Sequence, residues 1–295
     1  MTLEVALAAL PQLIVTGLMI GSIYALVALG YYIVHAATGV INFAQGDFVV
    51  IGLFMMWLSY VDLQFPLWAA IAFTVITTSL FVALFERVGI SPVSNQAPMI
   101  PLLVTLAGGL LIRTLIELVW TSRPRPVPHY SGDEPIMFLG AAILPQAIWV
   151  IGGTLITLLL VYLFFKKTLF GLSMLASASD REGARVIGVN PRLISLYAFI
   201  LCAVISGIAG ALVVPITNAN TSLGIDLSLK GFAGAVLGGI ERPLAVVVGG
   251  LVVGLLEALV AGLISSEYRN LFVFAVLMVV IVLRPQGLLA LRTAK

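Results

Sequence analysis

Residues 38–52 read TGVINFAQGDFVVIG, and this polar stretch lies between two strongly apolar segments. It carries the polar side chains Asn42, Gln45 and Asp47 among three glycines. Backbone interrupted by glycine, and amide or acid side chains, cost free energy at membrane depth. They occur there only where other parts of the protein bury them or where they line a water-filled cavity. The polar stretch therefore indicates part of a transport path inside a membrane.

The composition of the chain indicates an integral membrane protein. Hydrophobic residues make up 61% and charged residues 9% of the 295 residues, whereas a soluble domain carries about 25% charged residues. So few charges cannot cover a globular surface, and the long unbroken apolar runs favour helices over the alternating strands of a barrel. We expect an all-α polytopic membrane protein, a single transmembrane domain over residues 1–295, with about eight transmembrane helices plus two short broken or re-entrant segments.

The apolar segments set the expected spans. They predict helices at residues 11–34, 48–61, 66–85, 99–120, 146–165, 193–214, 244–264 and 271–283. The polar stretch and residues 229–240 are short and glycine-interrupted, and pairs of such segments point to the substrate site in transporters built from repeats. Residues 121–145 and 217–228 are expected to be polar loops.

Residues 166–192 form the most polar interior segment, with five basic and two acidic side chains. The positive-inside rule places this segment in the cytoplasm. Five predicted membrane crossings precede this segment, which puts the N-terminus outside the cytoplasm. If the polar stretch supplies part of a sixth crossing, the N-terminus lies inside instead. Ser179 and Glu182 have the spacing of a capping box, which predicts a short helix at Asp180–Ile187 that Gly188 ends. Such a helix is too short to be stable alone, so it must pack on lipid, on the chain's own helices or on a cytoplasmic partner.

Few ionisable side chains lie within the apolar segments. Asp47 is expected to cap a helix that begins at Phe48, or else to lie on the path. Glu257 has no basic residue within a helical turn, so it is a buried, partly protonated acid or a path residue. Arg113 and Glu117 are four residues apart, which favours an ion pair near the membrane interface over a path-lining role.

Several catalytic motifs are absent from the sequence. It contains no G-x-x-x-x-G-K-[ST] loop, so nucleotide binding by a phosphate-binding loop is not expected. It also contains no H-E-x-x-H motif and no G-x-S-x-G elbow, so the hydrolytic chemistry of those motifs is not expected. His129 is isolated and is expected to be a solvated loop residue rather than a metal ligand. We therefore expect no enzyme activity, no bound metal and, because basic tracts are absent, no nucleic-acid partner.

Five segments match one known family in the same order. They are GSIYALVALGYYIV at Gly21–Val34, GVINFAQGDFVVIG at Gly39–Gly52, DREGARVIGVN at Asp180–Asn190, AVLGGIERPLAVVVGGLVVGLLEAL at Ala235–Leu259 and FAVLMVVIVLRPQGLL at Phe274–Leu289. In these segments the chain resembles the H-type inner-membrane permeases of ABC importers for branched-chain amino acids. That family commonly has histidine at the position of Gln45 and often glutamate at that of Asp47.

The resemblance implies a division of labour in the bacterial inner membrane. A periplasmic binding protein delivers the substrate, and this chain forms the path with a second, related but non-identical permease subunit. Two cytoplasmic ATPases bind ATP and magnesium, so this chain needs no cofactor. The resemblance assigns ATPase coupling to the segment at 167–192, with the residues Ser179, Asp180, Arg181, Glu182, Ala184 and Gly188. The residues expected to line or support the path are Asn42, Phe43, Gln45, Asp47 and Glu257.

Other substrates and other classes of protein fit the sequence as well. Permeases of the same type also carry urea, short amides or aromatic acids. A stand-alone ion-coupled secondary transporter and a channel-like or structural membrane subunit are alternatives from other classes. Within the polar stretch, Asn42 and Gln45 either touch the substrate or hold the broken backbone by hydrogen bonds.

Overall fold

The computed structural model describes residues 3–289, apart from 95, 98, 121, 139, 187 and 285; the side chains of residues 3–6, 179, 181, 182 and 185 are also outside the description. The helices are α1 (Leu3–Thr38), α2 (Gln45–Trp57), α3 (Leu67–Phe85), α4 (Met99–Trp120), α5 (Pro145–Lys167), α6 (Leu169–Ser179), α7 (Arg181–Val186), α8 (Pro191–Thr217), α9 (Leu223–Gly238), α10 (Pro243–Leu263) and α11 (Arg269–Leu283). The strands β1 (Ile136–Phe138) and β2 (Ala141–Ile143) pair antiparallel. Short π-helices, Leu58–Asp62 and Glu86–Ile90, extend α2 and α3, and 3-10 turns occur at Ser91–Val93 and Ser266–Tyr268.

The outer surface of the bundle is apolar. Leu80, Leu118 and Val282 are each more than 70% exposed on the peripheral helices α3, α4 and α11, and such a surface is suited to lipid rather than water. By length and composition, seven described helices could cross a membrane: α1, α3, α4, α5, α8, α10 and α11 with their flanking turns. The shorter helices α2 and α9 occupy the two expected broken regions, so the predicted all-α membrane fold is confirmed.

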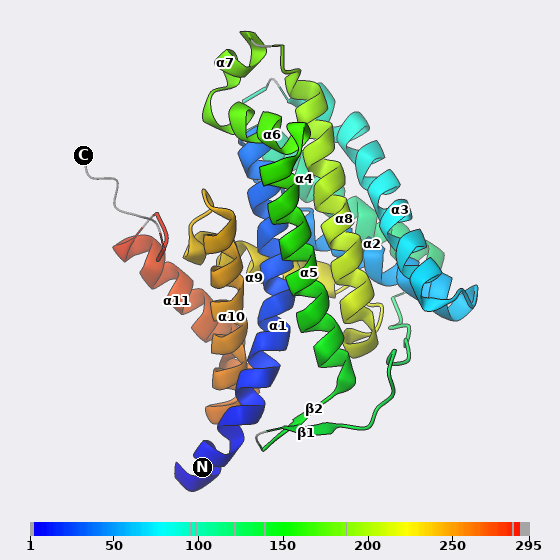
Figure 1. The fold of residues 1–295 in the computed structure, drawn as a ribbon, viewed down its shortest axis with the longest axis vertical. Helices are drawn as coiled ribbons and strands as arrows, with labels where there is room; N and C mark the ends of the chain where they lie inside the picture. Colours follow the sequence, from blue (N-terminus) through cyan, green and yellow to red (C-terminus); the bar gives the residue numbers. More distant parts are fainter. Residues whose placement is uncertain are drawn as a thin grey trace.

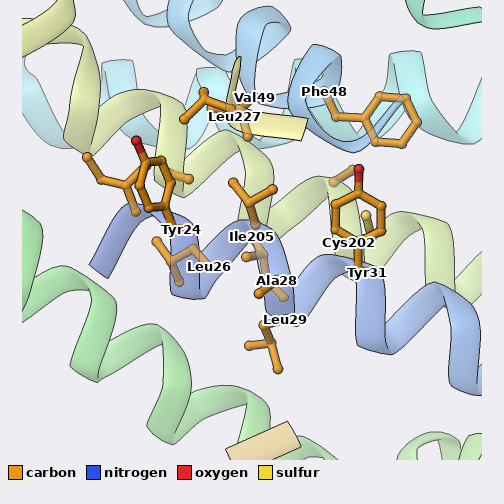
Figure 2. Close-up of a cluster of buried hydrophobic side chains, with 14 of the residues drawn as sticks. Tyr24, Leu26, Ala28, Leu29, Tyr31, Phe48, Val49, Cys202, Ile205 and Leu227 are labelled. Atoms are coloured by element: carbon orange, nitrogen blue, oxygen red, sulfur yellow. The ribbon is translucent and has the colours of Figure 1, made fainter. Parts of the chain in front are cut away.

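Helix α1 forms the centre of the bundle, and residues 21–34 within it are buried throughout. It packs against α8, α9 and α10 (Figure 1). Figure 2 shows Tyr24 and Tyr31 of α1 pointing to the side on which Leu227 of α9 and Phe48 of α2 lie. The core therefore joins α1 to both of the short helices.

The two ends of the bundle differ in what they carry. Helices α6 and α7 lie at one end, and the start of α1 and the β1–β2 hairpin lie at the other (Figure 1). Five helices, α1 to α5, precede α6. Four of them, α1, α3, α4 and α5, are among the seven possible spans, and the shorter α2 with its π-helix takes the place of the expected span at 48–61.

Three elements lie where the sequence predicts polar connections. Helix α6 and the β1–β2 hairpin occupy two of these regions, and α9 begins at Leu223 rather than at residue 229. The start of α9 reads as a loop because of its polar residues. In the structure, Asp226 and Lys230 pair along one face of α9 at 2.9 Å, so these residues belong to a helix.

The short helix α7 begins one residue later than its capping box predicts. Ser179 ends α6, and the Asp180 carboxylate accepts a hydrogen bond from the Gly183 N–H at 3.0 Å. Asp180 therefore caps α7, as acidic side chains commonly do at helix starts. Ile187, the predicted last residue, lies outside the described residues, and Gly188 follows with φ of 91°, as expected for the residue that ends a helix.

Candidate functional site

The polar stretch forms a non-helical connection followed by the first turn of α2. Helix α2 begins at Gln45 rather than at Phe48, so Asp47 lies inside its first turn and does not cap it. Helix α2 has 13 residues and the following π-helix has 5, which gives a length of about 27 Å at about 1.5 Å per residue. The predicted span at 48–61 is too short for a bilayer core of about 30 Å. The last residues of the polar stretch lengthen it by adding the first turn of α2.

Asn42 and Gln45 are fully buried and contact the protein itself. The Gln45 amide donates to the Ser206 hydroxyl at 3.1 Å and accepts from the Cys202 thiol at 2.6 Å. The Asn42 side-chain oxygen accepts from the Ala44 N–H at 3.2 Å. These contacts brace the broken backbone and tie α2 to α8.

Asp47 pairs with a residue of another helix. The Arg113 Nε atom of α4 lies 2.9 Å from a carboxylate oxygen of Asp47. The Arg113–Glu117 pair favoured by spacing is wrong, because Glu117 instead accepts a hydrogen bond from the Thr221 hydroxyl at 2.7 Å. A charge within a membrane bundle turns toward the interior and its nearest opposite charge, and for Arg113 that charge lies on α2.

A second buried ion pair lies between α9 and α10. Glu257 is 3% exposed and Lys230 is 1% exposed, and their charged atoms are 2.7 Å apart. The Tyr24 hydroxyl of α1 also donates to Glu257 at 2.7 Å. The sequence predicts the burial of Glu257 but misses Lys230, which lies on a different helix. The i, i+4 spacing of Asp226 and Lys230 is the signal that could have identified it.

Ser228 joins the polar stretch to α9. Its hydroxyl accepts from the Gly46 N–H at 2.9 Å and donates to the Phe43 carbonyl at 3.1 Å. The Tyr31 hydroxyl donates to the Ser228 carbonyl at 3.1 Å. The Phe43 ring also packs against Phe232 of α9, with 5.4 Å between ring centroids. The two glycine-interrupted segments predicted from the sequence are therefore in direct contact.

The remaining predicted residues are spread over positions 179–188. Asp180 and Gly188 are exposed, Ala184 is buried, and the side chains of Ser179, Arg181 and Glu182 lie outside the described ones. Their role in coupling stays a prediction. Within the described part of the chain, no three metal-ligating side chains lie together, and His129 pairs with Asp133 in the loop between α4 and β1.

Gly30 provides the space that the Gln45 side chain occupies. A Cβ atom at Gly30 would lie 2.0 Å from the Gln45 amide nitrogen. We expect Gly30→Ala to displace this amide from Ser206 and Cys202 and to lower the unfolding free energy by about 1–3 kcal/mol, the cost of leaving buried polar groups unpaired. Thermal unfolding of the detergent-purified protein measures this change.

A matched variant separates this effect from a general effect of alanine. Gly152 of α5 has nothing within 4 Å of an added Cβ, so Gly152→Ala should leave stability unchanged or raise it slightly. Adding Gln45→Ala to Gly30→Ala should remove the steric part of the loss. Equal stability of Gly30→Ala and Gly152→Ala would contradict the proposed contact.

Comparison with known proteins identifies similar chains. The family model described as "Branched-chain amino acid transport system / permease component" matches residues 13–281. The high-affinity branched-chain amino acid transport system permease protein BraD of Pseudomonas aeruginosa is 30% identical over 294 residues, covering 94% of this chain and 95% of the relative. The corresponding LivH protein of Escherichia coli K12 is 28% identical, covering 94% of each chain.

A solved structure shows a similar fold. PsaBC from Streptococcus pneumoniae, in complex with Fab, matches with a TM-score of 0.54 at 14% identity and covers 97% of each chain. At this identity, the likeness concerns the fold alone.

Proposed function

The chain belongs to the family of permease components of branched-chain amino acid transport systems, and from this premise we propose that it imports branched-chain amino acids as the transmembrane subunit of an ATP-driven transporter. The observation that carries the proposal is the extent of the family match, residues 13–281. This range includes the polar stretch, α7 and the α9–α10 pair. Leucine, isoleucine and valine are the proposed substrates, and urea, short amides and aromatic acids are the competing ones.

The energy for transport comes from partner subunits. Two cytoplasmic ATPases bind ATP and magnesium, a periplasmic protein delivers the amino acid, and a second, related permease subunit completes the path in the bacterial inner membrane. Support comes from α7, which has six residues and lies at the tip of the bundle (Figure 1). Its Val186 side chain is 87% exposed. An exposed apolar side chain on a helix too short to be stable alone suits a protein partner.

The described contacts connect α7 to α8 and α8 to the polar stretch. The Val189 N–H, just before α8, donates to the Ala184 carbonyl of α7 at 2.9 Å. Asn190 caps α8 directly after α7, with its side-chain oxygen accepting from the Arg192 N–H at 3.0 Å. Further along α8, Cys202 and Ser206 hold Gln45. When the ATPases close and displace α7, the displacement of α8 is transmitted to α2 through these hydrogen bonds. Asn42, Gln45, Asp47 and Glu257 thus support the path by positioning its helices, together with Phe43.

The coupling role of α7 can be tested by mutation. Replacing Arg181 and Glu182 together with alanine should lower ATP-driven uptake about 5- to 150-fold, the range of a typical coupling free energy, and leave membrane insertion intact. Uptake and ATP hydrolysis are measured together on the reconstituted complex. The matched control replaces Arg123 and Glu134, which are exposed in the outer loop. Unchanged uptake in the α7 variant would refute the assignment.

A further inference from the structure

A cavity of about 380 Å³ lies at the α7 end of the bundle. Its walls come from the end of α1, the π-helix and 3-10 turn that follow α3, the start of α4 and the start of α8. The polar residues that line it are Thr38, Glu86, Ser91, Ser94, Asn190, Arg192 and Ser195. Its volume falls within the range of about 300–1,000 Å³ that is typical of small-molecule sites.

One wall of the cavity carries a carboxylate with an unused acceptor. Glu86 is 1% exposed, and one of its oxygens accepts from the Ser195 hydroxyl at 2.7 Å. The other carboxylate oxygen is buried without a hydrogen-bond partner among the described residues. A buried acceptor in this state costs free energy. Glu86 lines the cavity, so a cationic donor that enters it and reaches this oxygen would supply the missing hydrogen bond.

The cavity also has a positive side chain, Arg192. Arg192 lies in the first turn of α8, is exposed, and makes no ion pair with the described residues. The start of the 27-residue helix α8 adds the partial positive charge of a helix N-terminus. Val40, Ile90 and Pro101 supply the apolar part of the lining. A ligand that matches the acidic, the positive and the apolar parts of the lining has an ammonium group, a carboxylate and a small apolar side chain.

We propose that this cavity binds an α-amino acid from the cytoplasmic side, with the ammonium group at Glu86 and the carboxylate at Arg192. The inference rests on the proposed function, because an importer of amino acids releases its product at this end. An amino acid in the cavity bridges α3 to the start of α8, directly after α7. It thereby resists the movement of α8 that α7 transmits, so accumulated product slows ATP hydrolysis.

The test uses the complete transporter in vesicles, with the ATPases facing the bath and leucine-loaded binding protein in the lumen. L-Leucine added to the bath should inhibit ATP hydrolysis saturably. 3-Methylbutylamine, which lacks the carboxylate, should inhibit more weakly, and 4-methylpentanoate, which lacks the ammonium group, should not inhibit. Glu86→Gln and Arg192→Gln should each weaken inhibition about 10- to 100-fold, the loss of one hydrogen bond to a charged group.

Further variants keep the test decisive. Glu134→Gln removes an exposed acid at the opposite end and should leave inhibition unchanged. Ser94→Phe fills the cavity from its rim without altering Glu86, so it tests the site even if Glu86→Gln does not fold. The site is refuted if bath leucine has no effect on the unmodified complex, or if Glu86→Gln, Arg192→Gln and Ser94→Phe are all inhibited normally. Absence of stimulation by the lumenal binding protein, before any bath leucine is added, contradicts the proposed function itself.

Discussion

Replacing Lys230 with methionine is expected to destabilise the protein by about 3–5 kcal/mol, the cost of removing one partner of a buried ion pair. Lys230 is 1% exposed and lies 2.7 Å from the Glu257 carboxylate. Without Lys230, this carboxylate stays buried between α9 and α10, and its remaining cation is the half-exposed Arg269, whose Nε atom lies 3.6 Å away. Unfolding of the purified protein by heat, followed by the loss of monodisperse material on size exclusion, measures the effect.

Two variants distinguish this cost from a general loss of charge. Asp226 also pairs with Lys230 at 2.9 Å, but its side chain is 41% exposed, so Asp226→Asn should cost no more than about 1 kcal/mol. Combining Lys230→Met with Glu257→Gln removes both buried charges and keeps an acceptor for the Tyr24 hydroxyl. The double variant should recover most of the lost stability; if it is less stable than Lys230→Met alone, the ion-pair explanation is wrong.

Adding a methyl group at Gly46 is expected to separate α2 from α9. A Cβ atom there would lie 2.1 Å from the Gly224 carbonyl oxygen and 2.6 Å from the Ser228 backbone nitrogen. Both contacts are with backbone, which cannot turn aside as a side chain can. Gly46→Ala should therefore cost about 1–3 kcal/mol or more through overpacking, and it should also break the hydrogen bond from the Gly46 N–H to Ser228. Thermal unfolding and ATP-driven uptake should both fall.

The control for Gly46 is a glycine with ordinary surroundings. At Gly89 the nearest atoms to an added Cβ lie 3.5 Å away, which is normal van der Waals contact. Gly89→Ala should retain the stability of the unmodified protein. If Gly46→Ala is as stable as Gly89→Ala, the close contact between α2 and α9 does not hold the site together.

Much of the fold follows from apolar runs that end at polar or proline residues. Helix α4 has the bounds that its run predicts, Met99–Trp120; α10 differs from prediction by one residue at each end, and α11 begins two residues earlier but ends as predicted. Prediction from apolar runs is wrong where the first turns of a helix contain polar residues, as those of α9 do. Lys230 pairs with Asp226 of its own helix and with the buried Glu257 of α10, and a pattern along one helix cannot show a partner on another.

The sequence proposes residues 38–52 as a candidate site, but it does not show which residues they contact. Glycine and amide residues at membrane depth identify residues 38–52. Their partners, Arg113, Ser206 and Ser228, lie on three other helices, so local spacing could not identify them. The same limit explains the preference for an Arg113–Glu117 pair, because sequence spacing takes no account of competition from Asp47.

Reconstituted uptake of radiolabelled L-leucine tests the central claim most directly. The full complex, with its ATPases, second permease subunit and loaded binding protein, should accumulate leucine only when ATP and magnesium are supplied on the ATPase side. Proton or sodium gradients alone should give no accumulation. Leucine uptake by this purified chain on its own, driven by such a gradient without ATP, would contradict the account and identify a secondary transporter instead.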